Sequence, residues 1–457
     1  MSIAIDPRLT GHGRRELRAD ALAIAAAGLR AADPAAALEG SLHLRGDRLV
    51  VRGRRIDGID ERAGDGETVV GLAGRRLFLV GAGKATLGMA AVLDELLGPR
   101  FSDAAVVVKR GEAAGRALRH VEVLEAAHPL PDESSLVAGL RLQAIARRAE
   151  PTDLVVAVVT GGSSALAVVP AAGVSLADKI ATNRLLLACG ADVVGMNAVR
   201  KHLSAIKGGL LGLTCGCEIV NFTASDVVGD PLDDVTDLTV PDTSSWASAQ
   251  ATCDRFALWD DLPPAVAARL RRADPGQETP RRLPAVHTWV MADAARMCTG
   301  AAAEAAARGY APEQLGLDWQ GEARAGAAAL VGRLGRAAPG ACLIAGGEHT
   351  VDLGAGARGA GGPNQEAALA AALGLAGGGA AAVICLDSDG TDGPTDAAGG
   401  IVDDLSAPAA AASGLDLSAA LEGHASQDAL AALGDLVVTG PTGTNVNDLK
   451  VALRARS

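Results

Sequence analysis

The sequence predicts an α/β protein of two domains. With 457 residues the chain is too long for one hydrophobic core, so two domains are the first expectation. A short apolar run, a glycine turn and a helical pattern follow one another at 76–97 and again at 153–166. Repetition of this unit is typical of a parallel sheet with helices on its faces.

Local patterns predict the other elements of the first domain. An Ala-rich helical pattern covers 13–33, and a β-like pair follows at 41–58. Residues 175–209 predict helices joined by polar turns, and 217–230 predict a strand that ends in a polar loop. The segment 260–284 is rich in Pro and Arg, which indicates a domain boundary or an exposed excursion.

The remaining chain predicts a second α/β domain. A helix is expected at 292–309, a strand at 341–348, a helix at 364–376 and a strand at 381–386. The apolar run at 436–438 is expected to form the final strand, with a helix after it. The predicted domains span residues 13–260 and 285–457.

Composition excludes several classes of protein. No apolar stretch reaches the ~20 uninterrupted residues of a membrane span, and no secretory signal pattern is present, so a cytoplasmic location is expected. Seven Cys without a CxxC pair fit a reducing compartment. A net charge of −12 argues against a nucleic acid partner, although a local basic pocket could still bind a small anion.

Lysine is rare, with six Lys against 36 Arg. Arg can occupy any position that requires only a positive charge. The remaining Lys are therefore candidates for positions that need a compact ammonium group. Chance survival of individual Lys codons is the alternative, since surface Lys is ordinary. Lys84, Lys201, Lys207 and Lys450 lie in or beside Gly-rich or polar motifs.

The turn GAGKAT at 81–86 predicts an anion site. Phe78 and Ala85 break the Walker A pattern, and Thr86 stands where a dinucleotide fingerprint requires a third glycine. Accessible amides at a helix start beside Lys84 still favour an anion. A tight turn with Lys84 in solvent is the alternative.

The segment TGGSSAL at 160–166 predicts a second cradle, for a phosphate or a carboxylate. Its glycines leave backbone amides accessible, and Ser163 and Ser164 add hydroxyl donors at a helix start. A serine hydrolase is the alternative, but Ala165 or Leu166, according to register, breaks the last position of the GxSxG elbow.

Two further segments of the first domain carry charge. NAVRKHLSAIKGG at 197–209 is predicted to bring Arg200, Lys201 and Lys207 together on one helical stretch, although a solvated basic face is the alternative. SDVVGD at 225–230 places Asp226 and Asp230 just beyond the predicted strand, which is the usual position of a Mg²⁺ ligand or a general base. An Asx turn is the alternative for Asp226.

Two polar loops dominate the second domain. SDGTDGPTDAAGG at 388–400 and VVTGPTGTNVNDL at 437–449 each follow an apolar run of strand type. Glycine lets the backbone approach a ligand, and the carboxylates, amides and hydroxyls supply groups that contact it. Ligands bind at the carboxyl ends of strands in open α/β sheets, so both loops are predicted to hold a ligand.

Together these segments resemble the glycerate 2-kinase family, whose C-terminal part is called the MOFRL domain. The resemblance runs from about residue 13 to residue 453 and includes ten motifs in order. They are VGAGKA, HPLPDE, GGSSAL, ATNRLLLACGADVVGMNAVRKHLSAIKGG, SDVVGD, TVPD, GGE, GGPNQE, DGTDGPTDAAGGIVD and TGPTGTNVNDL.

The resemblance implies an N-terminal Rossmann-like α/β/α domain and a C-terminal MOFRL-type α/β domain, with the active site in the cleft between them. It implies transfer of the γ-phosphoryl of ATP, with Mg²⁺, to the 2-hydroxyl of D-glycerate. Lys84 would face the transferred phosphoryl, residues 161–164 would hold phosphate or substrate carboxylate, and Asp226 would be the base or a metal-side carboxylate. The binding residues expected are Gly83, Gly161, Gly162, Ser163, Ser164, Arg200, Lys201, Lys207, Glu348, Asn364, Asp389, Asp392, Thr442, Asn445 and Asp448.

Departures from the family pattern leave the acceptor open. Pro363 stands where relatives often have Arg, and Asp237, Leu238 and Ala425 depart from the usual residues as well. Another hydroxy acid, an NAD(P)H-dependent hydroxypyruvate reductase and a catalytically silent relative are therefore the alternatives. The metal ligands are unassigned, and a homodimer is left open.

Overall fold

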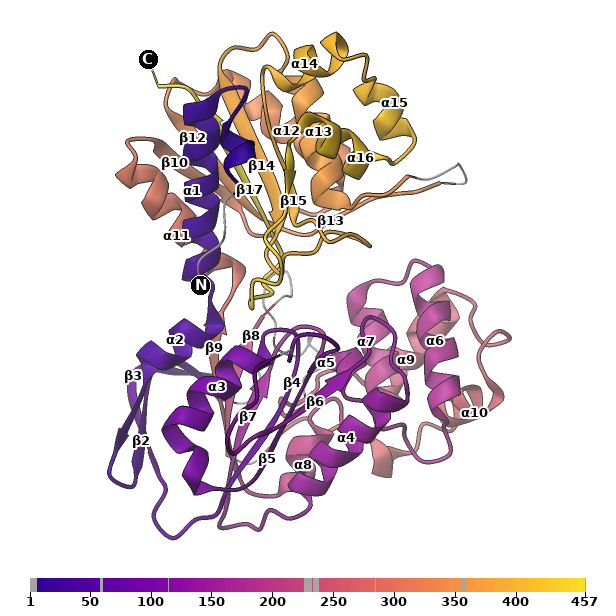
Figure 1. The fold of residues 1–457 in the computed structure, drawn as a ribbon. Coiled ribbons are helices and arrows are strands. Elements are labelled where there is room, and N and C mark those ends of the chain that lie inside the picture. Colours follow the sequence, from indigo (N-terminus) through magenta and orange to yellow (C-terminus); the bar gives the residue numbers. More distant parts are fainter. Residues whose placement is uncertain are drawn as a thin grey trace. The chain divides into compact units, whose positions relative to one another are not determined.

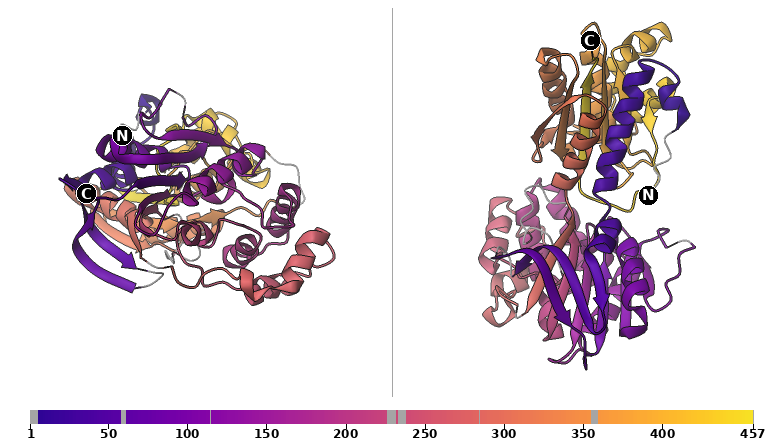
Figure 2. Two further views of the ribbon diagram at one scale, coloured as in Figure 1. Left: turned by 90° about the horizontal axis from the view of Figure 1, so that it is seen from below. Right: turned by 90° about the vertical axis from the view of Figure 1, so that its left-hand side faces the viewer.

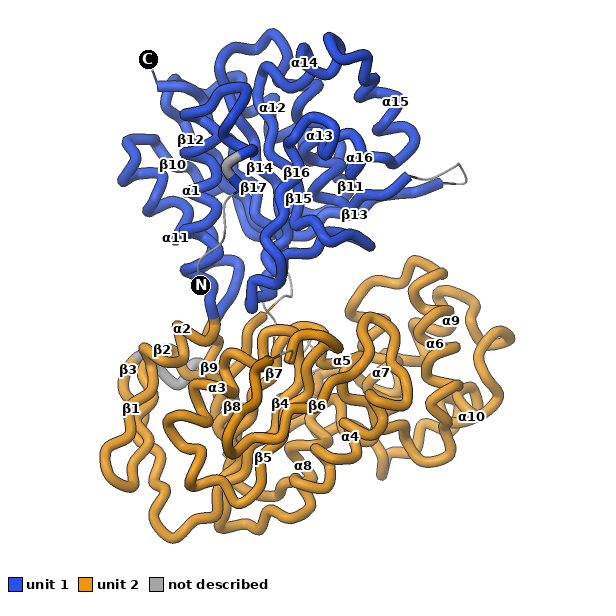
Figure 3. Tube along the Cα trace, in the orientation of Figure 1, with its two compact units in different colours: residues 1–33, 292–457 blue, residues 34–291 orange. Residues whose placement is uncertain are grey.

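The computed structural model describes residues 6–57, 61–113, 115–225, 232, 238–283, 285–354 and 359–456 (Figure 1). The chain forms two compact units (Figure 3). Unit 1 combines residues 1–33 with 292–457, and unit 2 contains residues 34–291. This division differs from the predicted domains 13–260 and 285–457, because the N-terminal helix joins unit 1 and the segment 260–284 stays inside unit 2.

In the described part of unit 2, nine strands form one sheet in the order β1-β2-β9-β8-β7-β4-β5-β6, with β3 paired to β2. Strands β4 to β8 pair in parallel, as predicted, whereas β1, β2, β3 and β9 form antiparallel pairs. The bounds are β1 Leu42–Arg45, β2 Arg48–Asp57, β3 Glu61–Gly71, β4 Leu77–Ala82, β5 Phe101–Lys109, β6 Glu122–Ala126, β7 Leu154–Val159, β8 Glu218–Ala224 and β9 Val286–Ala292.

Helices cover both faces of the parallel part of this sheet. Side chains alternate along β4, so Leu77 and Leu79 pack with Met89 of α3, while Phe78 packs on the other face with Leu142 of α4. Every residue of β4 and β7 is buried, as expected for parallel strands covered on two sides. The helices are α2 Pro34–Ser41, α3 Thr86–Leu97, α4 Glu133–Ala146, α5 Ser163–Leu166, α6 Leu176–Ala188, α7 Val193–His202, α8 Leu210–Cys215, α9 Trp246–Arg255 and α10 Pro264–Arg272, with 3-10 turns η2 Gly98–Arg100 and η3 Pro275–Gln277.

The predicted boundary segment 260–284 folds instead as part of a helical layer of unit 2. Its helix α10 buries Val266 and Leu270 in a core cluster shared with α6, α7 and α9. Of its arginines, Arg271 and Arg272 are exposed in the last turn of α10, whereas the half-buried Arg269 donates to the His202 carbonyl at 2.8 Å. Composition alone could not reveal that Val266 and Leu270 of this helix are buried.

In unit 1, six described strands form a second sheet in the order β10-β12-β17-β14-β15-β16, and β11 pairs with β13. The final segment, predicted to be a helix after the last strand, is strand β17, which lies between β12 and β14. Its apolar run is buried on both faces, and periodicity does not separate a buried strand from a buried helix. The bounds are β10 Ala311–Gly316, β11 Gly321–Glu322, β12 Ala341–Gly347, β13 His349–Thr350, β14 Ala381–Asp387, β15 Gly399–Asp403, β16 Leu436–Val437 and β17 Asp448–Arg454.

The N-terminal helix α1 belongs to unit 1 because it packs against α11 (Figure 2). A methyl group on Gly300 would lie 2.3 Å from the Ala31 Cβ, so the absence of a side chain permits this close approach. Arg18 of α1 is fully buried and forms ion pairs with Asp403 and Asp435. The helices of unit 1 are α1 Arg15–Ala31, α11 Ala294–Ala307, α12 Ala323–Arg336, α13 Pro363–Leu375, α14 Ser406–Ala412, α15 Leu417–Glu422 and α16 Ser426–Leu433, with the 3-10 turn η1 Pro7–Thr10.

Among the described residues, no single helix is both long and apolar enough to cross a membrane, and α1 and α2 meet these criteria only when they are taken together.

Candidate active site

Polar loops follow the carboxyl ends of strands in both units. In unit 2, the loops after β4, β6 and β7 leave the same edge of the parallel part of the sheet. In unit 1, the two predicted ligand loops, 388–400 and 437–449, follow β14 and β16. Each unit therefore carries a polar cluster of its own.

In unit 2, the two predicted anion turns are hydrogen-bonded to each other. The Lys84 backbone N–H donates to the Gly161 carbonyl at 2.9 Å. The Ala85 N–H donates to the Thr160 hydroxyl at 3.1 Å, and that hydroxyl lies 3.2 Å from the hydroxyl of Thr86. The turns after β4 and β7 thus form one structure, which we call the Lys84 turn pair (residues 83–86 and 160–164).

Two glycines of the Lys84 turn pair leave little or no room for a side chain. Gly83 has φ +142°, and a methyl group there would lie 2.0 Å from the Thr160 hydroxyl oxygen. Gly162 has φ +86°, and a methyl group there would lie 3.1 Å from Lys84 Cγ and 3.2 Å from the ring of His128. The Lys84 side chain therefore lies over Gly162. Ser163 is buried and Ser164 is half-buried in the same turn.

Lys201 takes part in a buried ion pair. Its Nζ donates to Asp242 Oδ1 at 2.7 Å, and both side chains are at most 3% exposed. Thr279 and Ser244 also donate hydroxyl groups to the Asp242 carboxylate. Burial opposes the ionisation of Asp242, but the Lys201 ammonium holds its pKa below the usual value. Asp242, in the TVPD segment, is a site neighbour that was not assigned from the sequence.

The predicted helical stretch at 197–209 is wrong in its second half. Helix α7 ends at His202, and Ser204 instead forms a bridge with Pro170. Gly208 and Gly209 then take positive φ values, which end any helical path. Lys201 and Lys207 are both buried, so the alternative of a solvated basic face does not apply to them. Arg200 donates to Asn183 Oδ1 at 3.2 Å, and burial lowers the pKa of Arg200.

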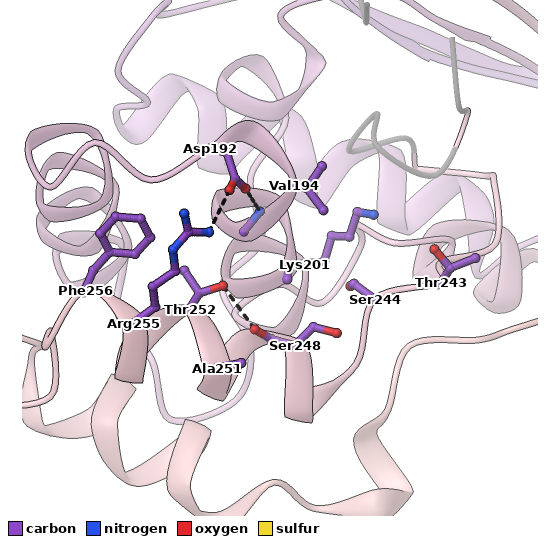
Figure 4. Close-up of a pocket in the computed structure, with 12 residues that line it drawn as sticks. Asp192, Val194, Lys201, Thr243, Ser244, Ser248, Ala251, Thr252, Arg255 and Phe256 are labelled. Carbon is purple, nitrogen blue, oxygen red and sulfur yellow. Dashed lines mark hydrogen bonds and ion pairs between the residues drawn. The ribbon is translucent and has the colours of Figure 1, made fainter. Parts of the chain in front are cut away.

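A surface pocket of about 390 Å³ lies over α7 and α9 (Figure 4). The Arg255 guanidinium contacts Asp192 at 3.3 Å at one end, and Lys201 lies toward Thr243 and Ser244 at the other. This volume is within the range of small-molecule sites. Among the predicted binding residues, Lys201 lines it, while Lys84 and the turn at 160–164 do not.

In unit 1, Asn364 joins two carboxylates. Its Nδ2 donates to Asp448 Oδ1 at 2.7 Å and to Asp392 Oδ1 at 3.2 Å. Lys450 Nζ donates to Asp448 Oδ2 at 2.7 Å, and the Gln365 N–H donates to Asp392 Oδ2 at 2.8 Å. The predicted residues Asn364, Asp392 and Asp448 are thus brought together, and Gln365 and Lys450 join them. We call these five residues the Asn364 cluster.

Burial shifts the pKa of Asp392 in the Asn364 cluster and of His349 beside it. It raises the pKa of Asp392 to about 6, although the Asn364 and Gln365 backbone amides oppose this shift. Burial also lowers the pKa of the neighbouring His349 to about 4, and the Lys450 ammonium acts in the same direction. His349 is therefore neutral near pH 7, whereas Asp392 titrates close to neutrality.

The two Gly-, Thr- and Asp-rich loops of unit 1 are tied together. The Ser388 N–H donates to the Asn447 carbonyl at 3.1 Å, and the Val446 N–H donates to Ser388 Oγ at 2.8 Å. The Thr442 hydroxyl donates to the Ser388 carbonyl. Thr442, predicted to contact a ligand, therefore holds the two loops together.

Other predicted residues lie outside these clusters or outside the described part of the chain. Glu348 is exposed between β12 and β13, and Asn445 is buried in the loop before β17. Asp389 accepts from the Thr391 N–H and hydroxyl, as in an Asx turn. Asp226, Asp230 and Asp237 lie outside the described residues. Pro363 occupies the first turn of α13, where its missing N–H has no helical partner to lose.

The described residues do not fit a metal centre. They contain no group of three or more His, Cys, Asp or Glu side chains placed to hold an ion. The carboxylate oxygens of Asp392 and Asp448 already accept hydrogen bonds from Asn364, Gln365 and Lys450.

Sequence models of two families match the chain. That of the domain of unknown function DUF4147 matches residues 20–271, and that of the MOFRL family matches residues 341–448. A glycerate 2-kinase of Pyrococcus horikoshii is 34% identical over 450 residues, which are 96% of this chain and 97% of that protein. A putative hydroxypyruvate reductase of Agrobacterium vitis is 41% identical over 83% of this chain and 87% of its own length.

The fold is shared with a solved kinase. The crystal structure of a glycerate kinase from Thermotoga maritima superposes with a TM-score of 0.79 and 31% identity, covering 96% of this chain and 99% of that one. Two α/β units with polar clusters at strand ends, together with these relatives, define a small-molecule kinase. The chain belongs to the glycerate 2-kinase family, and its C-terminal part is a MOFRL domain.

Proposed function

We propose that this protein transfers the γ-phosphoryl of ATP to the 2-hydroxyl of D-glycerate and releases 2-phosphoglycerate and ADP. Near-complete coverage of the Pyrococcus glycerate 2-kinase at 34% identity supports the reaction. The observation that carries the proposal is the Lys84 turn pair, where a lysine side chain lies over a glycine turn. Such a turn favours a phosphate group, whose charge the ammonium offsets.

Phosphoryl transfer depends mainly on position and charge, and the residues of unit 2 supply both. Lys84 would stabilise the charge that develops on the transferred phosphoryl. The amides and hydroxyls of residues 161–164 would hold the phosphate oxygens or the substrate carboxylate. Asp226 remains our proposed general base.

In unit 1, the Asn364 cluster would supply oriented amides and the Asp392 and Asp448 carboxylates. Mg²⁺ is proposed as the ion that accompanies ATP, since nucleoside triphosphates usually react with a divalent cation. We also propose a cytoplasmic location and leave the oligomeric state open.

Hydroxypyruvate reduction is a second candidate, because the Agrobacterium relatives carry that name. The position that would need the third glycine of a dinucleotide fingerprint is Thr86. Its side chain is buried and lies 3.2 Å from the hydroxyl of Thr160. This packing is a specific argument against a nicotinamide site at the turn.

The test is a kinase assay with purified protein, Mg-ATP and D-glycerate, coupled through enolase, which accepts 2-phosphoglycerate directly. We expect glycerate-dependent product, and we expect Lys84→Ala to lower kcat by at least about 100-fold through loss of transition-state charge stabilisation. Lys109→Ala is the matched control, because Lys109 ends β5 of the same sheet outside the Lys84 turn pair. Absence of glycerate-dependent 2-phosphoglycerate would overturn the proposal; product with a larger hydroxy acid would then identify a different acceptor, and NADH oxidation with hydroxypyruvate would favour the reductase.

A further inference from the structure

Three loops of unit 2 meet beside Gly162. Lys84 follows β4, His128 follows β6, and Gly162 follows β7. These strands belong to the parallel part of the sheet, so their carboxyl ends share one edge. His128 was not among the predicted site residues, although it opens the HPLPDE motif.

The position of the His128 ring is defined by its contact with Gly162. A methyl group built on Gly162 would lie 3.2 Å from both Cδ2 and Nε2 of His128. The same methyl group would lie 3.1 Å from Lys84 Cγ. The Nε2 edge of the imidazole and the Lys84 side chain therefore both lie against the Gly162 turn.

The loop that carries His128 is anchored at both ends by neighbouring residues. Ala126 pairs with Lys109 of β5, and its carbonyl accepts from the Arg110 N–H at 3.0 Å. Asp132 caps α4 by accepting from the Ser134 N–H at 2.9 Å. These contacts fix the loop that positions the imidazole.

We propose that His128 binds the terminal phosphate of the nucleotide beside Lys84. An imidazole donates a hydrogen bond from one nitrogen when it is neutral and from both when it is charged, so either form can contact a phosphate oxygen. With the Lys84 ammonium and the amides of the Gly162 turn, it completes a three-sided phosphate site. This inference rests on the proposed assignment of the Lys84 turn pair to ATP.

The first test measures nucleotide binding by calorimetry, with adenylyl imidodiphosphate as a non-hydrolysable ATP analogue, and with ADP. We expect His128→Ala to weaken binding of the analogue by about 10-fold or more and binding of ADP much less, because one charge-assisted hydrogen bond to the terminal phosphate is lost. His128→Gln, whose amide reaches a similar position, should recover part of the loss. Unchanged binding of the analogue, or an equal loss for both nucleotides, would overturn the inference.

His120→Asn is the matched control. His120 lies just before β6, at the other end of the same strand, and its Nδ1 contacts Asp94 at 3.0 Å. We expect this variant to bind both nucleotides like the wild type. Because these measurements contain no glycerate, failure of the glycerate assignment would leave their result unchanged and would be recognised separately in the kinase assay.

The second test changes Gly162, against which the side chains of His128 and Lys84 lie. Gly162→Ala would crowd both His128 and Lys84, whereas Gly173→Ala places a methyl group in open space at nearly the same φ, +81° against +86°. The two variants therefore have similar backbone strain, and only Gly162→Ala crowds neighbouring side chains. We expect Gly162→Ala to weaken binding of the analogue several-fold more than Gly173→Ala does. Equal effects of the two variants would contradict a shared His128 and Lys84 site at Gly162.

Discussion

Asp392 is a residue whose ionisation opposes folding. Its side chain is 1% exposed, and burial raises its pKa from 3.8 to about 6. Between these two pH values the folded protein binds a proton that the unfolded chain has released. The free energy of unfolding should therefore fall as pH rises from about 4 to about 6, by about 3 kcal/mol from this group.

The variant Asp392→Asn tests this expectation because an amide does not ionise. Urea unfolding between pH 4 and 7 should show that the wild type loses stability over this range by more than the variant does. Asp396→Asn, at an exposed carboxylate of the same loop, should behave like the wild type. If the stability of the wild type and of Asp392→Asn changes equally with pH, the pKa of Asp392 is not raised in the folded protein.

Lysine positions show how far the sequence predicted individual site residues. Four of the six lysines are at most 4% exposed: Lys179, Lys201, Lys207 and Lys450. Three of them, Lys201, Lys207 and Lys450, were among the four singled out from the sequence, whereas the fourth, Lys84, is half-buried. The partners could not be predicted, because Asp242 lies 41 residues from Lys201 and only folding brings them together.

At the scale of elements, helix α7 ends against two basic side chains. The last carbonyls of a helix lack helical partners. Here Lys179 Nζ donates to the Leu203 carbonyl at 3.0 Å, and Arg269 Nε donates to the His202 carbonyl at 2.8 Å. These contacts hold the end of the helix that carries Lys201.

We expect Lys179→Met to lower the free energy of unfolding by about 1 to 3 kcal/mol, because buried carbonyls lose their donor. Burial lowers the pKa of Lys179 from 10.5 to about 7, with help from Arg200 and Arg269. Between those pH values the unfolded chain binds the extra proton, so the contribution of Lys179 to stability should rise with pH.

Urea unfolding of both proteins at pH 7 and pH 9 measures this effect. The difference between the wild type and Lys179→Met should be larger at pH 9. Lys109→Met, at a half-buried lysine of β5, is the control. A difference that shrinks with rising pH would contradict the assigned pKa.

The elements were predicted best where a local pattern decides the structure. The buried runs of β4 and β7 and their glycine turns were predicted from the sequence, because parallel strands are apolar throughout. The end of α7 and the strand β17 were not. Ser204 pairs with Pro170, and β17 pairs with β12 and β14, so contacts distant in sequence decide both.

At the scale of the whole molecule, two units were predicted, but the membership of residues 1–33 was not. The helical pattern of α1 does not indicate which unit the helix packs against. Arg18 reaches Asp403 and Asp435, which lie 385 and 417 residues further along the chain. Chain order therefore suggested an N-terminal domain, whereas a buried ion network joins α1 to the C-terminal part.

We expect Arg18→Met to destabilise unit 1 through this network. The substitution leaves the Asp403 and Asp435 carboxylates, at most 1% exposed, without their buried cation, and breaking such a pair costs about 3 to 5 kcal/mol. Hydrogen exchange should show faster exchange in β15, which ends at Asp403, while β4 and β7 of unit 2 keep their protection. Arg15→Met, at an exposed position of the same helix, should change neither unit. Loss of protection confined to unit 1 is the expected result, because the buried ion pairs of Arg18 lie within that unit, and an equal loss in both units would contradict it.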